Sequence, residues 1–176
     1  YFQYLFNKAI QRQQSDGGFT ELTDQIADKT LSKIRDDFDI QPHHVTGKQV
    51  RLESRHPAVP SFIKFNAYIP GNADGDKAIL RINPDQISGY EDFVTEVRAV
   101  VSEHVDTLPE FEEGENDGEL ITSTIIRSAF NSKDEYVNSI AARLDNLIRT
   151  YHPILETELP MDEAVPNSAE KDQEGV

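Results

Sequence analysis

Cysteine and tryptophan are absent from the 176 residues, and methionine occurs once. Without cysteine the chain has no disulfide, no thiolate zinc site and no cysteine nucleophile. No apolar run approaches the roughly 18 residues of a membrane-spanning helix, and the N-terminus lacks the basic, apolar and small-residue layout of a signal peptide. We therefore predict a soluble, cytoplasmic protein with no membrane partner.

Apolar residues are also few: they form 37% of the chain, and charged residues form 28%. That balance indicates that part of the chain is unpacked, although 176 residues are enough for one domain with one core. Beyond residue 156 the sequence is mostly Pro, Asn, Ser and acidic residues, whose burial cannot offset the entropy cost of ordering. We predict a single α+β domain over residues 1–155 and a disordered acidic tail over residues 156–176.

Basic residues are scarce in the second part of the chain. The formal net charge is −15. Residues 1–100 carry 12 Lys and Arg against 14 Asp and Glu, whereas residues 101–176 carry 5 against 18, a net of −13. The second part is therefore disfavoured as a surface for nucleic acid or anionic lipid, and only the first part is free to form a basic surface.

Apolar periodicity divides the chain into helices and strands. Steps of three and four residues predict helices over residues 20–37, 88–109 and 132–151, and a short helix is predicted over residues 2–14. Ser88 and Ser132 each begin a capping box. Alternation and β-branched residues predict strands over residues 45–55, 61–69, 78–82 and 119–130. This order predicts an α+β fold, with a small, mainly antiparallel sheet of about four strands packed against helices.

No segment has a complete set of metal ligands. In the acidic loop over residues 110–119, Glu113 takes the first position of a calcium-binding loop, but the twelfth position is Thr124 instead of a bidentate Glu. The turn over residues 72–76 fails in the same way, because Lys77 stands where the loop requires Gly. We therefore predict no metal and no cofactor.

A metal-dependent hydrolase or nuclease-like domain is one alternative hypothesis. A run of acids and histidines offers a mixed metal or general-base site: Asp36, Asp37, Asp39, His43 and His44. Glu53-Ser54-Arg55 approaches the acid-x-Lys pattern of a restriction-type nuclease, but Arg cannot transfer a proton as Lys can. The chain has no nucleophile elbow and no phosphate-binding glycine loop, so the sequence assigns no catalytic residue.

The leading hypothesis depends on the outer face of the predicted sheet. Its cations point away from the apolar face and alternate with aromatic residues, which gives the predicted binding residues Arg51, Arg55, Phe62, Lys64, Tyr68 and Arg81. Cations beside aromatic residues on a sheet are typical of surfaces that stack bases and contact phosphates. We therefore predict a non-catalytic binding or regulatory domain that contacts nucleic acid or an acidic protein surface.

Two further expectations concern assembly. The opening Tyr1-Phe2-Gln3 is typical of a cleaved tag or an internal cut, which indicates one domain of a larger intracellular protein whose other domains are partners. The apolar stripe from Leu22 to Phe38 allows a dimerisation module as a third hypothesis. The sequence leaves the oligomeric state open.

Overall fold

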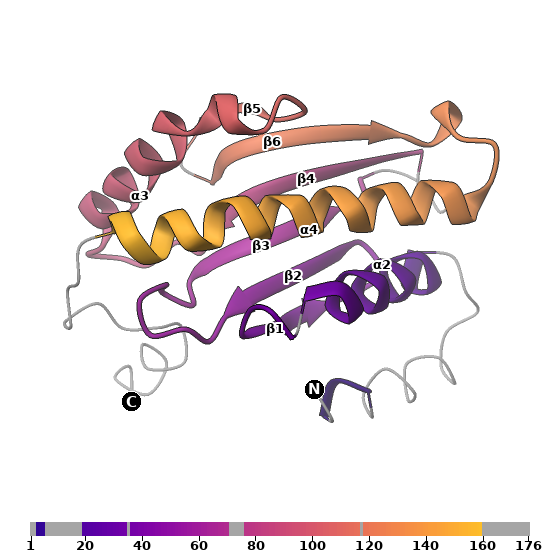
Figure 1. The fold of residues 1–176 in the computed structure, drawn as a ribbon, viewed down its shortest axis with the longest axis horizontal. Coiled ribbons are helices and arrows are strands. Elements are labelled where there is room, and N and C mark those ends of the chain that lie inside the picture. Colours follow the sequence, from indigo (N-terminus) through magenta and orange to yellow (C-terminus); the bar gives the residue numbers. More distant parts are fainter. Residues whose placement is uncertain (1–2, 6–18, 35, 71–75, 117, 160–176) are drawn as a thin grey trace.

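The computed structural model describes residues 3–5, 19–34, 36–70, 76–116 and 118–159. The main elements are, in order, α2 (Phe19–Ile34), β1 (Ile40–Val45), β2 (Gln49–Ser54), β3 (Ile63–Tyr68), β4 (Lys77–Pro84), α3 (Glu91–Glu103), β5 (Glu112–Asn116), β6 (Glu119–Ile126) and α4 (Lys133–Glu158). Two short 3-10 helices, η1 (Val105–Thr107) and η2 (Arg127–Ala129), follow α3 and β6. The chain therefore has the α+β fold that the sequence predicts (Figure 1).

The sheet has six strands, not about four, in the order β1-β2-β3-β4-β6-β5, and all neighbours are antiparallel. The two additional strands, β1 and β5, form its edges. β1 contains Pro42 and a bulge between Pro42 and His44, and β5 has the acidic sequence EEGEN. Edge strands bury little and pair through the backbone, so their sequences lack the apolar alternation that reveals a central strand.

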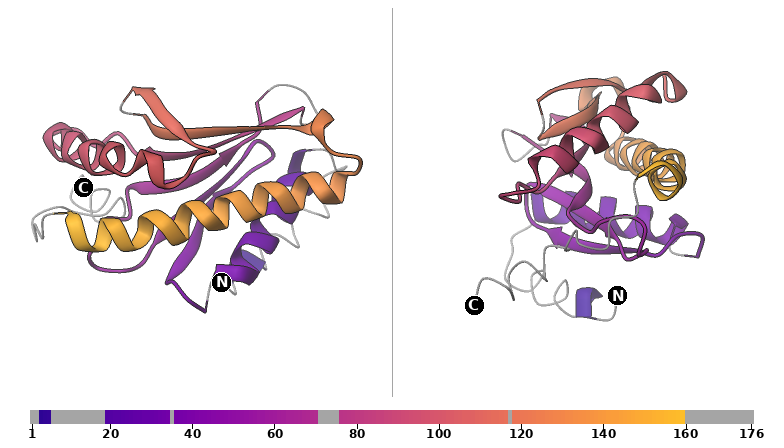
Figure 2. Two further views of the ribbon diagram at one scale, coloured as in Figure 1. Left: turned by 45° about the horizontal axis from the view of Figure 1, so that its top comes forward. Right: turned by 90° about the vertical axis from the view of Figure 1, so that its left-hand side faces the viewer.

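One face of the sheet, which we call the inner face, carries the apolar core. Leu52, Phe65, Ile82 and Ile121 are aligned across β2, β3, β4 and β6, and all four side chains are fully buried. Helices α2 and α4 lie side by side on this face, and α3 lies at one end of the sheet (Figures 1 and 2). The alternation of strand side chains thus places the core between one helical layer and the sheet.

Helix α4 is the longest element, with 26 residues. Its first turn is capped as predicted, because the Ser132 side chain accepts a hydrogen bond from the Glu135 backbone N–H. The predicted apolar stripe is buried along its whole length: Tyr136, Ile140, Leu144, Leu147 and Tyr151. None of the helices in the described segments is long and apolar enough to cross a membrane.

The end of α4 differs from the prediction. The sequence predicts that Pro153 ends the helix, but the helix continues to Glu158. Pro153 removes one backbone hydrogen bond, whereas Leu155 and Leu159 are buried and extend the apolar stripe. Burial of this added surface offsets the lost hydrogen bond. The rest of the predicted tail, residues 160–176, and most of the predicted helix over residues 2–14 lie outside the described residues.

Helix α2 packs its apolar stripe inside the chain. The stripe residues Leu22, Ile26, Leu31 and Ile34 are all buried. Polar contacts hold α2 against α4, because Lys29 Nζ donates to Asn138 at 2.6 Å and Arg149 donates to the Lys33 carbonyl at 2.8 Å. The third hypothesis, a dimerisation module, depends on an exposed stripe, and this stripe is covered by the protein's own helix and sheet.

Helix α3 begins differently from the prediction. The helix begins at Glu91, and its N-cap residue is Tyr90, two residues after the predicted start at Ser88. Gly89 separates the two residues and has a φ of 89°, a left-handed conformation that favours glycine. Val97 and Val101 are fully buried, and the Tyr151 hydroxyl donates to the Val101 carbonyl at 3.3 Å. Burial raises the pKa of Tyr151 to about 12, so it remains a donor at neutral pH.

We expect Leu144→Ala to lower the free energy of unfolding by about 2–5 kcal/mol, because it leaves a cavity between α4 and the sheet. Asn146→Ala is the matched control, since Asn146 is exposed on the same helix and should change stability by only about ±0.5 kcal/mol. Urea unfolding followed by circular dichroism measures both. Equal losses for the two variants would contradict the packing of α4 described above.

Candidate functional site

Strand register fixes the position of the predicted binding residues. Arg51 lies opposite Asn66, and Asn66 lies opposite Arg81, so these three side chains form one row across β2, β3 and β4. Lys64 lies opposite Glu53 on the same face. This face is directed away from α2 and α4, and we call it the outer face (Figure 2). Arg51, Lys64, Tyr68 and Arg81 therefore share one side of the sheet, as the predicted alternation requires.

Three predicted residues differ from the others in exposure or position. Phe62 is fully buried, and its ring packs edge-on against Phe93 of α3 with centroids 5.9 Å apart. Lys64 also has no exposed surface. Arg55 is exposed but follows the end of β2, where its N–H donates to the Asp39 carbonyl at 2.8 Å. The surface of the outer face therefore includes neither the Phe62 ring nor the Lys64 ammonium.

Each of the three central cations of the outer face is paired with an acid. Arg51 contacts Asp85 at 2.7 Å and Arg81 contacts Glu119 at 2.7 Å. The Lys64 ammonium lies 2.7 Å from Glu53 and 3.4 Å from Asp85. Three positive and three negative charges therefore balance. A protein binds a polyanion by replacing its counterions with free cations, and these three cations are already neutralised within the chain.

Hydrogen bonds to uncharged side chains hold the same groups in place. The Gln41 amide donates to Glu53 at 2.7 Å, and Arg81 donates to Asn66 at 2.6 Å. The Arg81 guanidinium also lies 4.9 Å from the centre of the Tyr68 ring, within the range of a cation–π interaction. The outer face is thus a hydrogen-bonded, preorganised polar surface.

The acids and histidines predicted as a hydrolase site are spread over several parts of the fold. Asp37 pairs with Arg149 of α4 at 2.7 Å, whereas His43 lies 3.5 Å from Glu53 on β2. Burial and the Lys64 charge lower the pKa of His43, which keeps this imidazole neutral. Across the described segments, no three of the predicted acids and histidines converge as metal ligands.

The nuclease-like site is partly assembled across strands. Lys64 supplies the lysine that the Glu53-Ser54-Arg55 segment lacks, and Asp85 supplies a second acid. Sequence reasoning missed Asp85, because it follows β4 and does not alternate with a strand pattern. However, the Lys64 ammonium sits between the two carboxylates, where a catalytic metal would need to bind. The geometry therefore favours an internal ion pair over a metal-dependent nuclease.

A second polar cluster connects α4 to the end of β2. Ser54 Oγ lies 2.7 Å from His152 Nε2, and His152 Nδ1 lies 2.6 Å from Glu156 Oε1. His56 Nε2 approaches the same carboxylate at 3.8 Å. Ser54 and His152 are 98 residues apart in the sequence, so no local pattern predicts that they meet.

This cluster has the residue types of a serine nucleophile with its base, but its geometry is structural. The exposed fractions of Ser54 and His152 are 2% and 1%, so a substrate carbonyl cannot reach the hydroxyl. The Glu156 carboxylate is near Nδ1 but is not aligned to accept its hydrogen bond. The Phe38 ring packs against His152 in a tilted arrangement and the His56 ring packs edge-on, with centroid distances of 5.1 and 5.9 Å. The cluster therefore joins α4 to β2 inside the protein.

Comparison with known proteins identified no relative. The chain matches no protein-family model, no curated protein sequence and no solved structure. Its function is therefore argued from the geometry of the outer face and of the polar clusters.

Glu53→Ala should lower the free energy of unfolding by about 3 kcal/mol, because it removes the nearer of the two carboxylates that pair with a fully buried ammonium. Lys64→Met removes that charge at similar volume and should cost less. Chemical denaturation compares the two variants. If both lose the same free energy, Lys64 does not depend on Glu53 in the folded state.

Stability should also fall in mild acid. Burial lowers the pKa of His152 from its ordinary value of 6.5, against the opposing effect of Glu156. The folded protein then binds fewer protons than the unfolded chain, so the free energy of unfolding is largest above about pH 6.5 and decreases as the pH falls toward the lowered pKa. His43, whose pKa is also lowered, adds to this decrease.

Melting temperatures measured between about pH 7.5 and 5.5 test this dependence, because ordinary carboxyl groups titrate mainly below that window. His152→Gln should reduce the slope of melting temperature against pH. Glu156→Gln should steepen it, because the neutral amide no longer stabilises the protonated imidazole. His44→Gln, at an exposed histidine, is the control. If His152→Gln leaves this slope unchanged, His152 is not the group that causes the loss of stability in mild acid.

Proposed function

We propose that the chain is a non-catalytic binding module that contacts a partner protein through the outer face of its sheet. The observation that carries this proposal is the arrangement of the layers. Helices α2 and α4 both cover the inner face, and no helix in the described ranges lies over the central strands of the outer face (Figure 2). The side chains of that face are held by ion pairs and hydrogen bonds, so a partner would meet a surface that is already ordered.

A group of adjacent side chains on this face has the composition of a protein interface. We call it the outer patch, and it consists of Tyr68, Ile79, Arg81, Thr124 and Ile126. The register places Tyr68 opposite Ile79 and Ile79 opposite Thr124. Ile126 is 49% exposed, the highest value among the large apolar side chains described. Tyr and Arg next to apolar side chains are typical of the residues that dominate binding energy at protein interfaces.

The charge of the outer face favours a protein over nucleic acid. Its three central cations are each paired with an acid, so few counterions would be released by a polyanion. The exposed cations Lys48 and Arg55 flank the two ends of β2, and the exposed Lys77 is the first residue of β4. Separate cations around an apolar patch suit acidic side chains at the rim of a partner protein.

Site-specific photo-crosslinking tests the proposal. A photoreactive phenylalanine analogue in place of Ile126 should crosslink one partner in extracts of the source cells. The same analogue in place of Asn146, which is exposed on α4, is the matched control and should not. With the crosslinked partner purified, Tyr68→Ala should weaken binding about tenfold or more, as expected for a buried aromatic anchor.

Two outcomes would contradict the proposal. Equal crosslinking from the α4 position would show that the outer patch is not a specific interface. Binding of single-stranded or duplex oligonucleotides at low salt, weakened by Arg55→Glu and by added salt, would favour nucleic acid as the partner instead. Circular dichroism of each variant checks that the fold is kept.

A further inference from the structure

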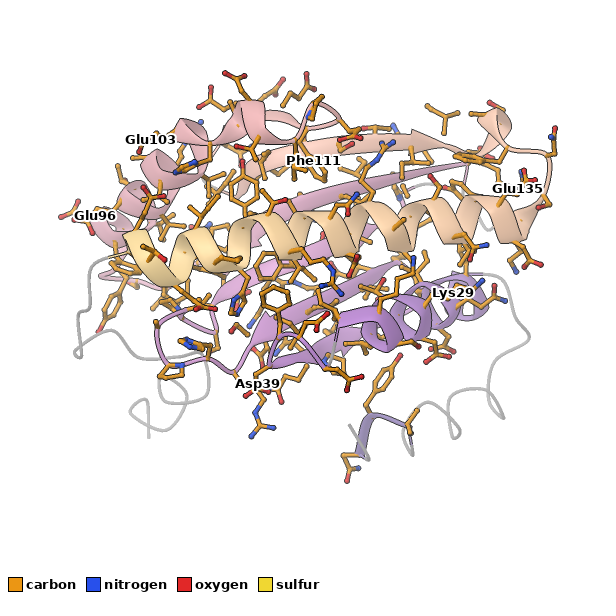
Figure 3. The ribbon with its side chains drawn as sticks, in the orientation of Figure 1. Lys29, Asp39, Glu96, Glu103, Phe111 and Glu135 are labelled. Atoms are coloured by element: carbon orange, nitrogen blue, oxygen red, sulfur yellow. The ribbon has the colours of Figure 1, made fainter. Side chains whose placement is uncertain are left out.

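The C-terminal ends of α3 and α4 meet and bring together three groups that can bind a metal ion. Glu103 is the last residue of α3, His104 is its C-cap residue, and Glu158 is the last residue of α4. One ligand atom from each lies within 4.8 Å of the others, and His104 Nε2 is 2.5 Å from Glu158 Oε2. Figure 3 labels Glu103 on α3. Sequence reasoning missed this group, because His104 and Glu158 are 54 residues apart.

Independent electrostatic features of the two helices also favour a cation here. The C-terminus of a helix carries partial negative charge, which a basic residue in the last turn usually complements. Neither α3 nor α4 has a basic residue in its last turn. Among the described residues, no Lys or Arg forms an ion pair with Glu103 or Glu158. Two helix ends and two carboxylates thus face one histidine.

The types of ligand indicate which cation fits. One imidazole nitrogen and two carboxylate oxygens are typical zinc ligands, and a fourth tetrahedral position remains for water. Calcium requires six to eight oxygen ligands, which this group does not provide. Tetrahedral zinc ligands lie about 3.4 Å apart, so the His104–Glu158 pair at 2.5 Å must separate slightly to admit the ion. Glu103 is exposed and the other two side chains are about one-third exposed, so their rotation meets little resistance.

We propose that Glu103, His104 and Glu158 bind one Zn²⁺ ion, which joins the end of α3 to the end of α4. This site lies at the opposite end of the molecule from Ile126, the last residue of β6 (Figure 1). The proposal is therefore independent of partner binding at the outer patch, and either can fail without the other. It also departs from the prediction that the sequence holds no metal.

Calorimetric titration of the metal-free chain with Zn²⁺ tests the site. We expect one ion per chain, with a rise in melting temperature that saturates with Zn²⁺ concentration. Co²⁺ in its place should give the visible absorption of a tetrahedral site. Ca²⁺ should produce neither effect.

Variants separate this site from incidental binding to an acidic surface. His104→Ala and Glu158→Gln should each weaken Zn²⁺ binding at least tenfold and remove the Co²⁺ spectrum. The controls are His44→Ala and Glu96→Gln, exposed residues outside the group, and should bind like the unaltered chain. For each variant we compare the melting temperature with and without Zn²⁺. A variant that is less stable without metal can therefore still be compared with the unaltered chain.

The proposal would be overturned by either of two results. One is the absence of one-to-one binding up to about 100 µM Zn²⁺, a concentration that would saturate a site of micromolar affinity. The other is Zn²⁺ binding of equal strength in His104→Ala and Glu158→Gln, which would place the ion elsewhere.

Discussion

Lys64 is a charged side chain with no exposed surface in one of the central strands of the sheet. An unpaired ammonium in that position would cost several kcal/mol, so the fold must place carboxylates beside it. Glu53 comes from β2 and Asp85 from the residue after β4, and Asp85 in turn pairs with Arg51. The contacts among Arg51, Glu53, Lys64 and Asp85 follow from this one requirement. A face that the sequence predicts to be basic becomes neutral because acids pair with this buried lysine and with Arg51 and Arg81.

The inner face is governed by a different constraint, the need of one sheet face to bury its apolar side chains. α4 meets that need for β3 and β4, contacts α2 along one side and reaches α3 near its end. The cluster of Ser54, His152 and Glu156 adds a polar contact at the same end of α4, inside the apolar layer. This contact includes a buried neutral imidazole. We therefore expect the stability of the contact between α4 and β2 to depend on pH, whereas the packing of the surrounding apolar side chains should not.

Periodicity predicts the elements that bury apolar side chains on one face, and it fails where pairing is through backbone or charge. The helix stripes, the four inner strands β2, β3, β4 and β6, and the Ser132 cap were predictable, since each is encoded within a few residues. β1 and β5 were not predictable, because their proline and acidic residues are typical of loops. The polar clusters could not be predicted for another reason. Glu53 and Asp85, Ser54 and His152, and His104 and Glu158 are far apart in the chain, and only strand register and helix packing bring each pair together.

The charge distribution of the folded chain therefore does not follow the charge distribution of the sequence. Arg81, from the nearly neutral first part, is neutralised by Glu119 from the acidic second part. Glu103 and Glu158, both from the acidic part, meet at two helix ends where the described chain provides only one histidine. The three central cations of the outer face are thus compensated, whereas two carboxylates with no Lys or Arg partner among the described residues meet where α3 and α4 end. For this fold, strand register and helix ends decide which charges are compensated, and the net charge of a segment does not.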